Sequence, residues 1–338
     1  MPGYHGTLSD TPKGLRLYRA FMSKRECLDT RSKYIIVVMT SALIVAFEAV
    51  AVEGAINTAH LTTFIVASVP QMIGGTILML AYPKGTSDFA RGLGRRGWLY
   101  MIALCAMVAG GVFMWFDAVG RIGASKEAIL GGGSSEVLFV VLLSAAFLSE
   151  RLNKWEILGS FLVLGGVFLV LANTETLQLT LGAGEIEAIL SSLMLAISII
   201  MTTKLLRSHD LTPLSGVELF ISGLILVLLG TAIGLIKMPD VNGALVLLGL
   251  GVIPSMSLLA YNAGLPKIGA SLTSVLFALN GVMTVGAQLL ILLLLPKANL
   301  ILPQNLGLAV VGGLIAFSGV YLLYRPGTRP VKPPERSL

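Results

Sequence analysis

The chain has few of the residues that soluble enzymes use for chemistry. Its 338 residues include 2 cysteines and 3 histidines, and only 12% are charged. Cys27 lies in the polar N-terminal leader and Cys105 within an apolar run, while the histidines are isolated from one another. The sequence therefore carries no disulfide framework, no metal-ligand spacing and no phosphate-binding loop. We expect no cofactor, no metal site and no enzymatic activity.

Long apolar runs dominate what is present. Hydrophobic residues make up 55% of the chain, and the mean hydropathy is +0.86, well outside the range of soluble globular proteins. About 20 apolar residues are enough to cross a bilayer as a helix. The sequence predicts an all-α membrane protein with ten transmembrane helices, at about 34–55, 60–82, 97–117, 123–148, 155–172, 183–203, 213–236, 243–262, 268–295 and 305–324.

One motif occurs twice, 146 residues apart. Ile122-Gly123-Ala124-Ser125 and Ile268-Gly269-Ala270-Ser271 each open a long apolar run that is followed by one more. This period divides the chain into a first five-helix repeat at 34–172 and a second at 183–324. An odd number of spans inserts the second repeat upside down, so the sequence predicts an inverted duplication, as in many secondary transporters.

The distribution of Lys and Arg predicts the orientation. Of the 24 Lys and Arg residues, 20 fall in the 1–33 leader, the 325–338 tail or the loops on the same side, whereas Arg121, Lys237 and Lys297 fall on the other side. The positive-inside rule places both termini in the cytoplasm of a multi-pass cell membrane protein (inner or plasma membrane). The leader is polar and basic and has no cleavage site, so the first span serves as the anchor. Orientation and lipid contact explain the net charge of +6 without a nucleic-acid partner.

These motifs resemble the EamA branch of the drug/metabolite transporter superfamily. The resemblance covers nearly the whole chain after residue 33. It implies a fold of ten helices in two inverted five-helix repeats, which moves small metabolites by alternating access through a central cavity. The second repeat departs from the pattern, because Leu295-Pro296-Lys297 stands where the first repeat has Glu150-Arg151-Leu152. The residues that carry the resemblance are 117–118, 121–125, 149–152, 159 and 165–167, with a second copy at 261–263, 268–271 and 319–320.

Acidic residues inside the predicted spans are the main candidates for a site. A charged side chain near the bilayer centre costs at least about 2.5 kcal/mol, so it usually faces a cavity or a partner. Glu136 lies near the middle of the fourth span, after three glycines that loosen the helix. Asn280 corresponds to Ser134 under the 146-residue offset. We expect Glu136 and Asn280 to contact substrate, and Glu48, which has apolar neighbours in the first span, to carry a proton.

Lys126 and Glu127 enter the same span at its outer end. They either neutralise each other or bind substrate, with Lys126 as an anchor for an anionic group. Glu127 and Glu136 are nine residues apart, about 900° of helical rotation, so on a straight helix they face opposite ways. They form one site only if the glycines bend the helix. Glu53 is expected at the membrane interface, and Glu187 is expected to cap the sixth span.

Prolines and aromatic residues provide the remaining candidates. Pro70, next to Gln71, is expected to interrupt the second span, and Pro254 the eighth. Trp115 and Tyr261 fit an aromatic belt at the membrane interface or stacking against a planar substrate. We expect the first, third, fourth, sixth, eighth and ninth spans to line the cavity.

The sequence therefore predicts a secondary transporter that exports a small metabolite such as an amino acid or related amphipathic compound, and Glu48 would couple that export to protons. One alternative is a nucleotide-sugar or organic-phosphate exchanger of the same superfamily, which needs more cationic side chains than Lys126. Another is an intramembrane lipid-modifying enzyme, which has no evident use for an inverted duplication. A monomer suffices for one central cavity, and a dimer remains open.

Overall fold

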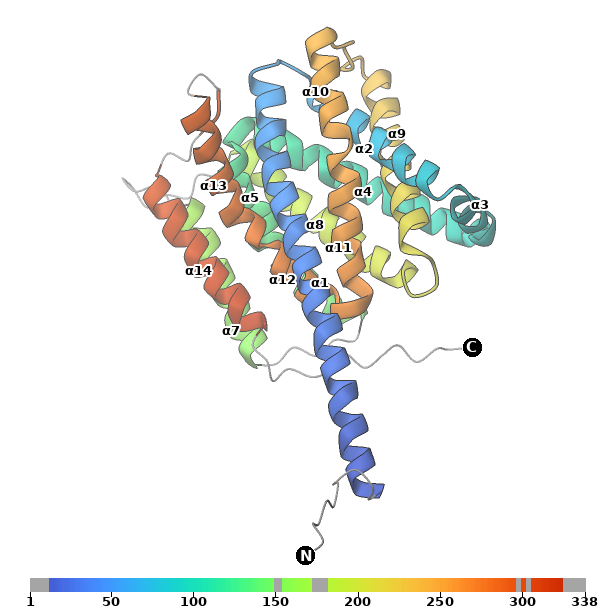
Figure 1. Ribbon diagram of the computed structural model, residues 1–338. Coiled ribbons are helices and arrows are strands. Elements are labelled where there is room, and N and C mark those ends of the chain that lie inside the picture. The colour runs from blue at the N-terminus through green and yellow to red at the C-terminus, as the bar shows by residue number, and fades with distance from the viewer. Residues whose placement is uncertain (1–11, 149–153, 172–181, 296–298, 302–304, 325–338) are drawn as a thin grey trace, which may run out of the picture.

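The computed structural model describes residues 12–148, 154–171, 182–295, 299–301 and 305–324. Within these ranges the chain is helical and has no β-strand (Figure 1). The elements in chain order are α1 (Pro12–Asn57), α2 (Thr63–Ala81), α3 (Pro83–Gly92), α4 (Gly94–Ile122), α5 (Ala124–Leu130), η1 (Gly131–Ser135), α6 (Glu136–Phe147), α7 (Lys154–Leu171), α8 (Ala183–Leu205), α9 (Leu211–Ala232), α10 (Val241–Gly251), α11 (Ile253–Ile268), α12 (Ala270–Phe277), α13 (Leu279–Leu294) and α14 (Leu306–Tyr324).

Eight stretches of the described residues are long and apolar enough to cross a membrane. They correspond to the first to fourth and the sixth to ninth predicted spans. The fifth and tenth predicted spans form α7 and α14, whose apolar parts within the described residues are shorter, at 157–166 and 306–319. The structure therefore confirms an all-helical, multi-span architecture, and the total of ten spans stays a prediction.

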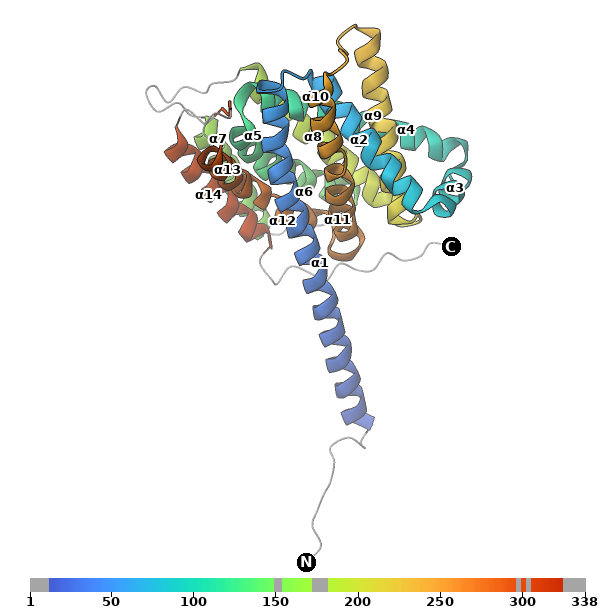
Figure 2. The same ribbon diagram turned by 45° about the horizontal axis from the view of Figure 1, so that its top comes forward.

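The first helix is much longer than its predicted span. α1 begins at Pro12, so residues 12–33 of the leader continue the first span as helix and project from the bundle (Figures 1 and 2). A short amphipathic helix, α3, occupies part of the predicted basic loop after the second span. Phe89 of α3 is buried against α4 and α9, whereas the basic side chain of Arg91 is exposed.

The two copies of the repeated motif have the same backbone conformation. Gly123 (φ 85°, ψ 153°) ends α4 and Gly269 (φ 87°, ψ 158°) ends α11, and each is followed at once by a new helix. These dihedral angles are essentially accessible only to glycine. The glycine N–H groups donate to the equivalent carbonyls of Val119 and Leu265, at 3.0 and 3.2 Å. The 146-residue offset seen in the sequence is therefore a structural repeat.

The helix after each of these glycines is broken at an equivalent place. In the first repeat, five residues of π-helix separate α5 from α6. In the second repeat, α12 gives way to α13 at Ala278, which corresponds to Gly132 under the same offset. The two breaks meet where the helices cross, because a Cβ on Gly133 would lie 3.4 Å from the carbonyl oxygen of Ala278, and one on Gly281 would lie 2.9 Å from the carbonyl oxygen of Ala128.

The last helices of the two repeats pack against each other at one edge of the bundle (Figures 1 and 2). In each of the two helices, one glycine packs against the backbone of a glycine in the other helix. A Cβ on Gly166 of α7 would lie 2.5 Å from the carbonyl oxygen of Gly312, and one on Gly319 of α14 would lie 2.6 Å from that of Gly159. Small residues let the two backbones approach closely, which is a common way for helices to associate in membranes.

The two prolines behave differently from each other. α2 runs through Pro70 without a break, so the predicted interruption of the second span is wrong. The Nε2 of Gln71 donates to the carbonyl of Ala67, at 2.9 Å. The eighth span does break near its proline, since α10 ends at Gly251 and α11 starts just before Pro254.

Candidate substrate-binding site

Side chains from both repeats surround a central cavity of about 160 Å³. This space is sufficient for several water molecules or for a small organic molecule. The lining comes from α1, α2, α4, the α5–η1–α6 segment, α8, α9, α11 and the α12–α13 segment. Among the described residues, α7 and α14 contribute nothing to it. The second and seventh spans, α2 and α9, therefore line the cavity in addition to the six spans that the sequence predicted to line it.

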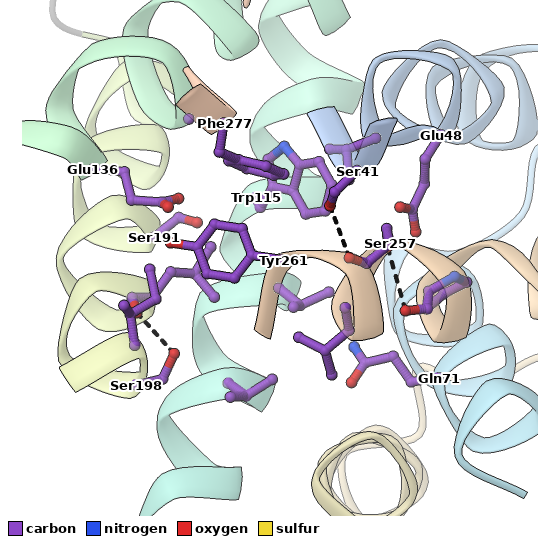
Figure 3. A pocket seen from close by; sticks show the side chains of 18 of the residues that line it. Ser41, Glu48, Gln71, Trp115, Glu136, Ser191, Ser198, Ser257, Tyr261 and Phe277 are labelled. Carbon is purple, nitrogen blue, oxygen red and sulfur yellow. Dashed lines mark hydrogen bonds between the residues drawn. The ribbon is translucent and has the colours of Figure 1, made fainter. Parts of the chain in front are cut away.

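Most of the residues singled out in the sequence lie along this one cavity. Glu48 and Glu136 are at opposite sides of it, and the rings of Trp115, Tyr261 and Phe277 lie between them (Figure 3). The arrangement brings together residues from α1, α2, α4, α5, α6, α11, α12 and α13. Of the eight predicted site residues, seven line the cavity: Glu48, Gln71, Trp115, Glu127, Glu136, Tyr261 and Asn280.

Glu127 and Glu136 line the same cavity although a straight helix would point them in opposite directions. The π-helical turn between them explains the difference. A π turn takes up one extra residue, so the nine residues rotate the chain like eight residues of α-helix, about 800°. The two side chains then point about 80° apart instead of 180°. The Ser134 hydroxyl stabilises this turn by donating to the carbonyls of Ile129 and Leu130, at 2.5 and 3.1 Å.

A hydrogen bond orients one of the aromatic rings. The indole Nε1 of Trp115 donates to Oε2 of Glu127, at 2.7 Å. The other carboxylate oxygen of Glu127 lies against Gly131, where a Cβ would collide with it. The first glycine of the triplet therefore makes room for the carboxylate, and the carboxylate holds the indole at the cavity wall.

Lys126 is the predicted site residue that does not line the cavity. Its Nζ pairs with Oε1 of Glu185 at the start of α8, at 2.5 Å, and not with Glu127. The other oxygen of Glu185 accepts the N–H of Gly182, at 3.0 Å, so Glu185 also caps α8. Glu187, which the sequence suggested as the cap, instead pairs with Arg121, at 3.1 Å. The cation of Lys126 is thus neutralised away from the cavity.

Glu48 and Glu53 are both buried on α1 but have different surroundings. Glu53 is fully buried within the protein, and its expected position at the membrane interface stays a prediction. Its carboxylate accepts the N–H of Ala124 at 3.0 Å, the Nε2 of Gln288 at 2.9 Å and the N–H of Ile301. Glu48 lines the cavity, and the described part of the chain gives its carboxylate no hydrogen bond or ion pair. Glu53 joins helices together, whereas Glu48 is free to interact with a ligand.

Some lining residues were not among the predicted site residues. Glu218 of α9 lies on the cavity, and one of its carboxylate oxygens has no partner. The sequence could have indicated that α8 lines the cavity, because Ser191, Ser198 and Thr202 recur at helical spacing and so share one face of the helix. Phe277 had no such signal, because it stands in an apolar run like any other buried residue.

The comparisons with known proteins agree with this architecture. Solved structures match the chain, and one of them, titled "Crystal structure of protein", superposes with a TM-score of 0.61 at 18% sequence identity. The match covers 87% of this chain and 98% of that chain, which shows a shared fold. No curated protein matches the sequence. The model of the EamA-like transporter family matches twice, at residues 32–172 and 182–325, once for each repeat. The chain therefore belongs to the EamA-like transporter family and is a multi-pass membrane protein of the drug/metabolite transporter superfamily.

Proposed function

We propose that this protein is a secondary transporter that exports a small, positively charged metabolite through the central cavity by alternating access. One observation supports the charge of the substrate. The cavity is lined by four buried carboxylates, those of Glu48, Glu127, Glu136 and Glu218. No Lys or Arg stands among the described residues that line it.

Four carboxylates in one apolar cavity require cations. Burial of ionised groups within the membrane is costly, and like charges repel strongly at low dielectric. Protons or a cationic substrate can supply the compensating charge. Because both compete for the same carboxylate oxygens, substrate binding would release protons and proton binding would release substrate. This competition is the physical basis of a proton-coupled antiport.

The geometry suggests different roles for the two best-separated carboxylates. Glu136 shares its side of the cavity with Tyr261 and Phe277 (Figure 3), and an aromatic ring is a favourable surface for an organic cation. Asn280 lies close by, since a Cβ on Gly132 would be 3.2 Å from its Nδ2. We assign substrate contact to Glu136 and Asn280, and the proton to Glu48 on the opposite side.

The same lining argues against the anionic alternatives. A nucleotide sugar or an organic phosphate needs basic side chains, and the one basic side chain expected to supply them, Lys126, is bound to Glu185. An intramembrane lipid-modifying enzyme is a weaker proposal for a different reason, because the family to which the chain belongs consists of transporters.

The membrane orientation completes the proposal. The excess of Lys and Arg on one side favours both termini in the cytoplasm of the cell membrane. The cavity lies within one chain, so a monomer is sufficient for transport.

The test is uptake into proteoliposomes with and without an imposed pH gradient, using labelled organic amines, amino acids and phosphate esters. We expect saturable flux of cations that responds to the gradient. Glu136→Gln should abolish this flux, and Glu48→Gln should preserve binding but remove the response to pH. The control is Glu187→Gln, which changes a carboxylate outside the cavity and should leave flux unchanged. Flux of phosphate esters alone, or no flux above that of empty liposomes, would contradict the proposal.

A further inference from the structure

The serine hydroxyl groups of the cavity wall use their protons on the protein itself. Ser41 donates to the carbonyl of Ser257 at 2.7 Å, and Ser191 donates to that of Gly111 at 2.8 Å. Ser192 and Ser198 donate to carbonyls of their own helix, at 2.8 and 2.7 Å. A hydroxyl has one proton and two lone pairs, so after donating its proton it can only accept. These serines therefore present acceptors to the cavity.

Two N–H donors of the wall are also used on the protein. The indole of Trp115 donates to Glu127, and the amide of Gln71 donates to the carbonyl of Ala67. Three acceptor oxygens of the wall, Gln71 Oε1, Glu218 Oε2 and Asn280 Oδ1, are buried without a hydrogen-bond partner among the described residues. Unpaired buried acceptors are costly, which points to a ligand that brings donors.

Several lining groups retain donors of their own. The amide of Asn280 and the hydroxyl of Thr202, whose oxygen also has no partner, can donate to a ligand, and the amides of Gln71 and Asn262 each keep a second N–H. All of these groups are neutral, and they stand among four carboxylates. Neutral donors do not offset the repulsion that a bound anionic group would meet in this cavity.

We infer that the cavity selects a protonated primary amine without a carboxylate, in preference both to the corresponding amino acid and to the corresponding quaternary ammonium. The inference rests on the proposed function and specifies its substrate class. A primary ammonium brings three N–H donors to a wall of acceptors. A quaternary ammonium has the same charge but no donor, and an amino acid adds a carboxylate that finds few partners.

The aromatic rings select the body of the substrate and not its head group. Trp115, Phe116, Tyr261 and Phe277 line the cavity and offer an apolar surface to a hydrocarbon or ring. Cation–π attraction is available to primary and quaternary ammonium groups alike. Discrimination between these two must therefore come from hydrogen bonds, because a site built to bind N–H groups rejects an analogue that lacks them.

The experiment compares three probes that share one phenylethyl body: 2-phenylethylamine, phenylalanine and trimethyl(2-phenylethyl)ammonium. Binding to purified full-length protein in lipid nanodiscs is measured by titration calorimetry, and flux is measured separately in proteoliposomes. We expect the amine to bind at least about ten-fold more tightly than either of the others, the loss expected when about 1.4 kcal/mol of hydrogen bonding is removed. Binding of phenylalanine or of the quaternary probe as tight as that of the amine, or no binding of the amine, would overturn the inference.

Variants separate charge from hydrogen bonding. Glu136→Gln should weaken the binding of both the amine and the quaternary probe, because it removes a negative charge. Gln71→Leu should weaken the binding of the amine and leave that of the quaternary probe unchanged, because it removes a hydrogen-bond acceptor. Thr76→Val, on the same helix but outside the cavity, is the control and should change neither. An equal effect of Gln71→Leu on both probes would count against the inference. If the amine binds selectively but no flux is seen, the proposed transport is wrong and the selectivity holds. If all three probes bind equally and show equal saturable flux, the selectivity is wrong and the proposed transport holds.

Discussion

Ser125 and Ser271, the equivalent serines of the repeated motif, each hydrogen bond to a helix of the other repeat. The Ser125 hydroxyl donates to Oε1 of Gln288 on α13, and the hydroxyls of Ser271 and Ser144 on α6 lie 2.9 Å apart. The motif thus ties the repeats together twice. At the Ser125 contact the connection extends further, because Gln288 also donates to Glu53 on α1 and to the carbonyl of Ile301.

We predict that Glu53 supports stability and that Glu48 does not. Glu53→Gln places an amide N–H₂ against three donors and should lower the free energy of unfolding by roughly 2 kcal/mol. Glu48→Gln, five residues earlier on the same helix, removes a carboxylate without internal partners and should cost much less. Thermal unfolding of the purified variants in detergent measures both. Equal losses would show that Glu53 has no special role in joining the helices.

The space beside Gly131 is predicted to be essential for the site. Gly131→Ala puts a Cβ against the Glu127 carboxylate, which must then move and release Trp115. We expect at least about a ten-fold loss of substrate affinity, the equivalent of about 1.4 kcal/mol. The matched control is Gly165→Ala on α7, where a Cβ meets nothing within 4 Å. If Gly131→Ala binds like the control variant, the position of Glu127 does not matter for binding.

The contact between α7 and α14 is predicted to affect stability but not binding. Gly319→Val forces a side chain into the backbone of α7 and should destabilise the protein by about 1 to 3 kcal/mol, the usual cost of overpacking. Binding per folded molecule should be unchanged, because neither helix lines the cavity. Gly307→Ala, at the open end of α14, should have little effect on either quantity. Loss of binding in folded Gly319→Val would mean that this helix pair controls the cavity.

The orientation can be tested by labelling introduced cysteines. With both termini in the cytoplasm, Lys237→Cys lies outside and should react with a membrane-impermeant maleimide in intact cells. Arg91→Cys on α3 should react only after the membrane is made permeable. The background variant replaces Cys27 with Ser and Cys105 with Ala, so that no native thiol reacts. The reverse labelling pattern would mean that the predicted topology is inverted.

Much of the architecture follows from local features of the sequence. The apolar runs locate the membrane-spanning helices to within a few residues. Two helical segments have no such run, namely the leader, which extends α1 to Pro12, and α3. The repeated motif predicts its own backbone, because Gly123 and Gly269 adopt dihedral angles that other residues avoid. The family assignment, made from the same motifs, is confirmed by the match of the EamA-like transporter model to both repeats.

The sequence by itself determined which polar groups enter the membrane, since a carboxylate in an apolar run is visible without any structure. Only the tertiary structure decided what each one does. A single π turn brings Glu127 to the same cavity as Glu136, and Glu185, 59 residues away, removes Lys126 from it. Glu48 and Glu53 lie five residues apart on one helix, yet Glu53 meets donors from distant segments and Glu48 meets an open cavity. The reason is physical: helix formation depends on neighbours along the chain, whereas the partner of a buried charge is supplied by residues that only folding brings near.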